Sequence, residues 1–209
     1  MDLLKGSSIV LEGSMNAYNQ MCDYVKRNTP LDDEEYAAVC ELMDVDSYIN
    51  FWICEIFFGN TDYWNIKYYR DNSGGGKWRW VLYDLDWCLW PSTYYSYNMF
   101  VFALEEHGAG KLLNCLMTNS TFKQLFISRF EQYLDTVFET QRMLDIFDAM
   151  VTELEPEMDA HIDRWNDQGN EYKLTCPRSY ESWQSYVRTL RSVIEDANAH
   201  TRSDMEKYF

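Results

Sequence analysis

Acidic and amide side chains cluster in two short stretches, each directly after an apolar segment: Asn60, Asp62 and Asn65, then Asp84 and Asp86. Asp84 and Asp86 alternate at the end of a strand-like segment, so both can turn toward one point beyond the sheet edge. Carboxylate oxygens at such a point suit Mg²⁺, which keeps several waters and binds substrate phosphates. These residues are therefore candidates for a metal-assisted site.

The order of these groups is that of a phosphate-transfer site in outline. A carboxylate base and an amide metal ligand on one loop, followed by a hairpin and a metal-binding Asp, is the protein-kinase arrangement. The interval between Asp62 and Asp84 leaves room for one hairpin. Asp-x-Asp alone is a weak signal, because it is also common as a solvated turn. The 60–65 loop before the hairpin favours a site.

The elements that must position these groups are a helix and a hairpin. Residues 48–59 are apolar nearly all round, which predicts a central helix capped by Asp46 or Ser47 and ended at Gly59. Glu55 is the exception on this helix; either it has a buried partner or it reaches the rim. Residues 66–70 and 78–83 read as two strands joined by a Gly-rich turn.

The rest of the chain reads as helices with apolar stripes. Helices are expected at 14–27, at 111–116 and from 178 to near the end. Further helices are expected to begin with an acidic first turn at 32–35, at residue 119, at a cap formed by Thr140, and again after Pro156. A polar loop is expected at 166–173. The predicted fold is mainly α (α+β), with a short antiparallel hairpin at the active centre, like the larger lobe of a kinase.

Composition limits the partners. The 209 residues carry a formal net charge of −16, which argues against nucleic acid and against an anionic membrane surface. An acidic chain can still bind a nucleotide through a divalent metal. No apolar run approaches membrane length, residues 1–6 do not resemble a signal peptide, and the six Cys form no C-x-x-C pair.

Other chemistries have less support. The three His lack metal-ligand spacing, no G-x-S-x-G elbow is present, and no helix start with Lys-Ser/Thr follows the Gly-rich turn. Two alternatives stay open: a metal-dependent glycosyltransferase using Asp-x-Asp, which would need a parallel sheet, and a non-catalytic pseudokinase or surface interaction module using the many Trp and Tyr. A phosphatase of the haloacid dehalogenase type fits less well, because Trp87-Cys88 follows Asp86.

Residues 58–65 (FGNTDYWN) and 76–87 (GKWRWVLYDLDW) resemble the CotH kinase family, atypical protein kinases named for a spore-coat protein. Residues 44–49, 122–130 and 161–165 are similar to the family as well, so the resemblance covers most of the chain. Asp62, Asn65 and the Asp84-x-Asp86 pair are its most specific part.

The resemblance implies that Asp62 is the catalytic base and Asp84 the metal-binding Asp, with Asn65 and Asp86 as supporting metal or phosphate ligands. It implies transfer of phosphate from ATP to Ser or Thr of a protein, with Mg²⁺ or Mn²⁺. It also implies a spore-coat, cell-surface or secreted location. Residues 1–209 are then one CotH-like kinase domain whose nucleotide-binding lobe lies further N-terminal, with only its end at 3–13. A truncated domain of this kind could lack activity.

Overall fold

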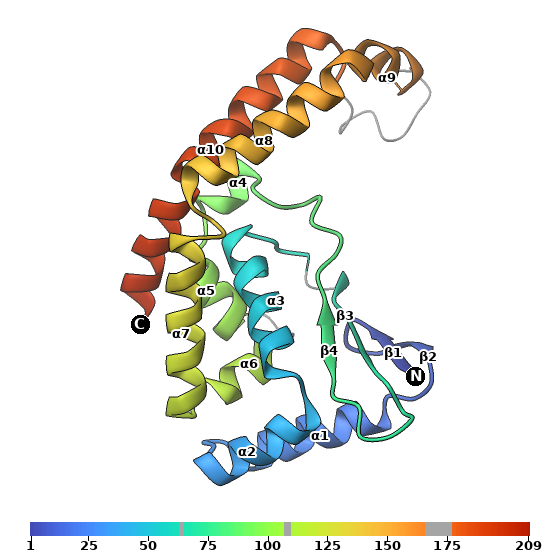
Figure 1. The fold of residues 1–209 in the computed structure, drawn as a ribbon, viewed down its shortest axis with the longest axis vertical. Coiled ribbons are helices and arrows are strands. Elements are labelled where there is room, and N and C mark those ends of the chain that lie inside the picture. Colours follow the sequence, from blue (N-terminus) through green and yellow to red (C-terminus); the bar gives the residue numbers. More distant parts are fainter. Residues whose placement is uncertain (63–64, 107–109, 166–176) are drawn as a thin grey trace. The chain divides into compact units, whose positions relative to one another are not determined.

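A computed structural model describes residues 1–62, 65–106, 110–165 and 177–209. The chain forms two compact units, one of Met1–Gln132 with Ser203–Phe209 and one of Tyr133–Arg202. The first unit contains β1 (Asp2–Lys5), β2 (Ile9–Glu12), α1 (Asn16–Arg27), α2 (Asp33–Leu42), α3 (Val45–Phe57), β3 (Lys67–Arg70), β4 (Arg79–Val81), α4 (Pro91–Tyr94), α5 (Met99–Val101), the π-helix η2 (Phe102–Glu106), α6 (Lys111–Leu116) and most of α7 (Ser120–Asp135). Figure 1 shows α3 between β4 and α7.

The second unit is helical. It contains α8 (Thr140–Leu154), the 3₁₀ turn η4 (Glu155–Glu157), α9 (Met158–Trp165) and most of α10 (Tyr180–Tyr208). α8 and α10 run side by side (Figure 1), and Arg191 pairs with Asp148 across them. Asn198 Nδ2 donates to the carbonyl oxygens of Leu134 and Phe138 at 2.7 and 2.8 Å, which fixes the turn between α7 and α8.

The sheet is antiparallel and four-stranded, in the order β2-β1-β3-β4. The predicted hairpin is confirmed as β3 and β4, in which Tyr68 pairs with Trp80. The hairpin of β1 and β2 was not predicted. It adds to the other edge of β3, and Asp2 on β1 receives hydrogen bonds from Arg70, Asn72 and the Ser14 amide. The N-terminal segment is therefore part of the sheet that carries the active-centre hairpin.

α3 is the predicted central helix, but its cap differs from the prediction. Asp44, rather than Asp46 or Ser47, caps it by accepting the Ser47 amide at 2.9 Å. The backbone of Asp44 is still extended while Val45 is already helical, so only the Asp44 side chain reaches back to the free amides. Asp46 lies in the first turn and pairs with Arg129 of α7.

α3 ends in a tight reversal at Gly59. Its φ is +64°, and the amides of Gly59 and Asn60 bond the carbonyls of Ile56 and Glu55. This is the Schellman pattern, and it confirms the predicted end at Gly59. The reversal sends the chain from the buried helix directly into the 60–65 loop.

Gly59→Ala is expected to destabilise the protein by about 2–4 kcal/mol. An added Cβ would face both a left-handed backbone and the buried Tyr94 ring at 2.5 Å. Gly75→Ala is the matched control, because Gly75 has φ +72° but open space around it, so it should cost only about 1 kcal/mol. Urea midpoints compare the two, and equal losses would mean that contact with Tyr94 contributes nothing.

Two of the remaining helix starts differ from the prediction. α1 begins at Asn16 rather than at residue 14, and the Ser14 hydroxyl accepts the Asn16 amide at 3.1 Å. The acidic start of α2 is confirmed as a capping box, in which Asp32 accepts the Glu35 amide and Glu35 accepts the Asp32 amide. At α8 the cap is Glu139 rather than the predicted Thr140, because its longer side chain accepts the amides of Gln141 and Arg142. Pro156 interrupts the helix as predicted. The predicted polar loop at 166–173 lies outside the described residues.

Within the described ranges, no helix combines the length and the apolar character that a membrane span requires.

Candidate active site

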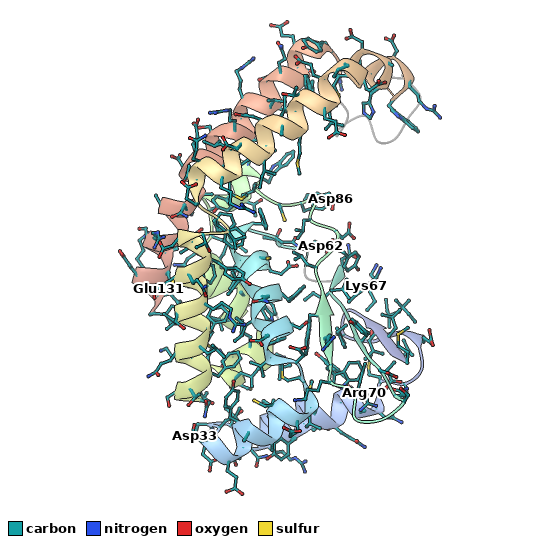
Figure 2. All side chains as sticks on the ribbon, in the orientation of Figure 1. Asp33, Asp62, Lys67, Arg70, Asp86 and Glu131 are labelled. Atoms are coloured by element: carbon teal, nitrogen blue, oxygen red, sulfur yellow. The ribbon has the colours of Figure 1, made fainter. Side chains whose placement is uncertain are left out.

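The candidate site lies in the first unit, beyond the C-terminal ends of α3 and β4. Figure 2 shows Asp62 and Asp86 in this region, with Lys67 of β3 below them. The chain reaches it twice: once through the reversal at Gly59, and once as β4 continues into Asp84. A rigid helix and a paired strand thus hold the two acidic stretches.

Asp62 and Asn65 are joined as their spacing suggested. Asn65 Nδ2 donates to Asp62 Oδ2 at 2.7 Å, and the Asn65 amide bonds the Asp62 carbonyl at 3.3 Å. The Asp62 amide in turn bonds Asn60 Oδ1 at 3.0 Å. In the described contacts, Asp62 Oδ1 and Asn65 Oδ1 accept no hydrogen bond. Residues 63 and 64 lie outside the described residues.

Glu55 has a buried partner and does not reach the rim. Its side chain is 2% exposed, and its Oε2 accepts a hydrogen bond from Asn60 Nδ2 at 2.7 Å. The pKa of Glu55 is raised to about 7, mainly by burial; the hydrogen bond from Asn60 opposes this rise, and the negative charge of Asp62 contributes to it. The carboxyl group therefore changes charge near neutral pH.

This shift predicts a pH-dependent difference between the wild type and Glu55→Gln. The folded state binds the Glu55 proton more tightly than the unfolded chain, since the pKa rises from 4.5 to about 7. The stabilisation is complete below pH 4.5 and is lost as the pH rises through 7. Between pH 4.5 and 8 the free energy of unfolding of the wild type should fall by about 3 kcal/mol relative to Glu55→Gln. Denaturant titrations at several pH values measure the difference, and a constant difference would contradict the assignment.

Asp84 and Tyr83 belong to the same region as Asp62. Asp84 has φ +60°, a left-handed conformation that Asp tolerates better than most residues and that often marks functional sites. Burial raises the pKa of Tyr83, and the charges of Asp84 and Asp62 raise it further, so both carboxylates lie near this phenol. Lys67 Nζ lies 4.1 Å from the Tyr83 ring centroid, which brings a positive charge to the acidic region.

Asp86 and Cys88 complete the second stretch. Burial raises the pKa of Cys88 to about 12, and the charges of Glu55 and Asp86 add to the effect. The thiol therefore stays protonated at neutral pH, which argues against a nucleophilic Cys here. Glu55, in α3, thus lies near both acidic stretches.

A divalent metal at this site would have few protein ligands. In the part of the chain that the structure describes, no three His, Cys, Asp or Glu residues group to hold a metal. The predicted set of Asp84, Asn65 and Asp86 contains only two carboxylates and one amide, and Mg²⁺ commonly uses one or two carboxylates plus waters and phosphates. The Tyr83 hydroxyl is buried and lacks a hydrogen-bond partner among the described residues, so one polar atom is available to a ligand.

Fold and site together define a mainly α, kinase-like α+β protein with two acidic stretches at the ends of a central helix and a strand. The model of the family described as CotH kinase protein matches residues 4–200, and the chain belongs to this family. No curated protein and no solved structure matches the chain. Family membership confirms the resemblance, whereas the roles of Asp62, Asn65, Asp84 and Asp86 stay predictions.

Lys67 and Tyr83 were not predicted as part of the site, and the particular role of Asn60 was not predicted. Lys67 and Tyr83 lie on the hairpin strands or directly after them, and in sequence they look like ordinary strand residues. Asn60 was noted only as an amide in the loop, and its two bonds show that it connects Glu55 to Asp62. A polar residue directly after a helix-ending Gly is the only sequence signal that could have indicated it.

Proposed function

We propose that the chain is an atypical protein kinase that transfers the γ-phosphate of ATP to Ser or Thr of a protein substrate. The proposal rests mainly on how the Asp62 carboxylate is held. One of its oxygens is fixed by Asn65, at 2.7 Å, and the other is left for an acceptor hydroxyl. Membership of the CotH kinase family supports the reaction class. By the same membership we propose a spore-coat, cell-surface or secreted location, which cell fractionation would test.

Asp62 acts as the general base. Asn65 orients its carboxylate, and Asn60 holds its backbone amide, so Asp62 needs little rearrangement to accept the hydroxyl proton of Ser or Thr. Phosphate transfer passes through a loose transition state, so positioning and charge neutralisation supply most of the rate. Lys67 places a positive charge beside the same region.

Asp84, Asn65 and Asp86 would hold the divalent metal that accompanies ATP. When bound, such an ion neutralises charge on the phosphates. Asp84 directs its carboxylate from a left-handed backbone position, and Asn65 retains Oδ1 while its Nδ2 is occupied by Asp62. The same chain residues thus align the nucleotide with the base.

The alternatives differ in what they require. A glycosyltransferase with Asp-x-Asp is expected on a parallel sheet, whereas the strand pairs that the structure describes in its sheet are antiparallel. A pseudokinase would keep the fold without transferring phosphate.

Incubating the 209-residue chain with ATP labelled in its γ-phosphate, Mg²⁺ or Mn²⁺ and a library of Ser/Thr peptides tests the kinase proposal. Labelled peptides are expected, and a folded chain that labels none while hydrolysing UDP-sugars would overturn it.

A further inference from the structure

Glu55 is an unexpected residue for its place in the fold. It is the only charged side chain between Tyr48 and Phe57 of α3, and its neighbours Ile53, Ile56 and Phe57 are buried. Among the described residues no Lys, Arg or His forms an ion pair with it. A buried carboxylate without a cation costs stability, and an apolar residue would fill the position at lower cost. Stability alone therefore does not explain Glu55.

The hydrogen bonds of Glu55 lead to the 60–65 loop. Its Oε2 accepts from Asn60 Nδ2 at 2.7 Å, and its backbone carbonyl accepts the Asn60 amide at 3.0 Å. Asn60 is 3% exposed, and its remaining side-chain atom, Oδ1, accepts the Asp62 amide at 3.0 Å. Because Nδ2 is occupied by Glu55, the amide plane of Asn60 is oriented with Oδ1 toward Asp62.

We propose that Glu55 and Asn60 are positioning residues that transmit the rigidity of α3 to Asp62, an inference that rests on the proposed function of Asp62 as the base. Asn65 holds the Asp62 carboxylate and Asn60 holds its backbone, so the residue is fixed at two points. Loss of the backbone support leaves Asp62 chemically intact but misplaced, and small misplacements of a catalytic group cost large factors in rate.

The proposal specifies which property of Glu55 matters. Asn60 needs an acceptor oxygen, which Gln supplies as well as Glu. A negative charge at this position also repels Asp62, as the raised pKa of Glu55 indicates. Glu55→Gln should therefore preserve the support, whereas Glu55→Leu removes it and places an apolar, helix-compatible side chain among apolar neighbours.

The kinetic test compares Glu55→Leu, Glu55→Gln, Asn60→Ala and the double variant Glu55→Leu/Asn60→Ala. Glu55→Leu and Asn60→Ala should each lower kcat by about 10- to 100-fold with the KM for ATP almost unchanged, and the double variant should be no worse than the poorer single one. Glu55→Gln should stay within about threefold of the wild type. Asn119→Ala is the control: Asn119 is equally buried in the same unit but bonds Asp33 and Phe122, so its loss should lower stability and leave kcat unchanged.

A second measurement separates this inference from the proposed function. The exchange rate of the Asp62 amide hydrogen, followed by NMR, should rise about tenfold or more in Glu55→Leu but not in Glu55→Gln. The Tyr48 amide of the same helix, bonded to Asp44, is the internal control. If the exchange rate of the Asp62 amide hydrogen is unchanged in Glu55→Leu, Glu55 does not support Asp62, whatever the kinase activity of the variant. Absent phosphate transfer in the wild type, with accelerated exchange in the variant, overturns the kinase proposal and leaves the support in place.

Discussion

Asp62→Asn is expected to lower kcat for phosphate transfer by about 10²- to 10⁴-fold. Asn has nearly the same shape as Asp, and its Oδ1 can still accept the hydrogen bond that Asn65 Nδ2 now donates to the Asp62 carboxylate, so the loop should keep its geometry. The amide cannot accept the proton of the acceptor hydroxyl. Initial rates at saturating ATP, with a Ser or Thr peptide found in the library, measure the effect.

Asp71→Asn is the matched control, which tests whether the loss of any negative charge would lower the rate. Asp71 is exposed in the β3–β4 turn and bonds only Ser73 in the described contacts, so Asp71→Asn should change the rate by less than about twofold. Binding of ATP to Asp62→Asn should match the wild type, because the base acts on the acceptor and not on the nucleotide. A variant that retains a third of the wild-type rate would show that Asp62 is not the base.

Asp84→Asn is expected to reduce transfer by about 10³-fold or more, since removing the charge weakens the hold on the metal that neutralises the phosphates. The substitution is well matched to the backbone, because Asn tolerates the left-handed conformation at φ +60° as well as Asp does. Lost activity will therefore not reflect a strained fold, and the thermal midpoint should stay close to that of the wild type.

The metal dependence of Asp84→Asn gives the sharper readout. The concentration of Mg²⁺ or Mn²⁺ that gives half-maximal rate should rise at least about tenfold, whereas in Asp71→Asn it should not change. An Asp84→Asn protein with unchanged rate and unchanged metal requirement would remove Asp84 from the site.

The sequence predicted the elements that follow from local chemistry. The apolar run of α3, its stop at Gly59 and the Gly-rich turn between β3 and β4 are local signals, and each is confirmed. The hairpin of β1 and β2 was missed because Ile9, Val10 and Leu11 are half-exposed in a very short strand, so nothing in their pattern indicates that they pair with β1, or that β1 pairs with β3. The α3 cap was misplaced because three polar residues compete there and the backbone decides between them.

At the site, too, contacts that follow from local spacing were predictable and contacts that depend on the fold were not. The contact of Asp62 with Asn65 follows from their spacing on one loop. The contact of Glu55 with Asn60 depends on the left-handed turn at Gly59 and on burial, neither of which sequence spacing reveals. Tyr83 reads as a strand aromatic, and only the arrangement in space shows its buried hydroxyl near Asp62 and Asp84.

The central claim is a metal–ATP site at Asp84 beside the base Asp62. Calorimetric titration of ATP into the 209-residue chain and into Asp84→Asn tests this claim most directly. Each titration is made with Mg²⁺, with Mn²⁺ and with a chelator, and UDP-sugars serve as the comparison. The account predicts ATP binding that requires the metal and is lost in Asp84→Asn. Binding of UDP-sugars without ATP, or ATP binding that is indifferent both to chelator and to Asp84→Asn, would contradict it.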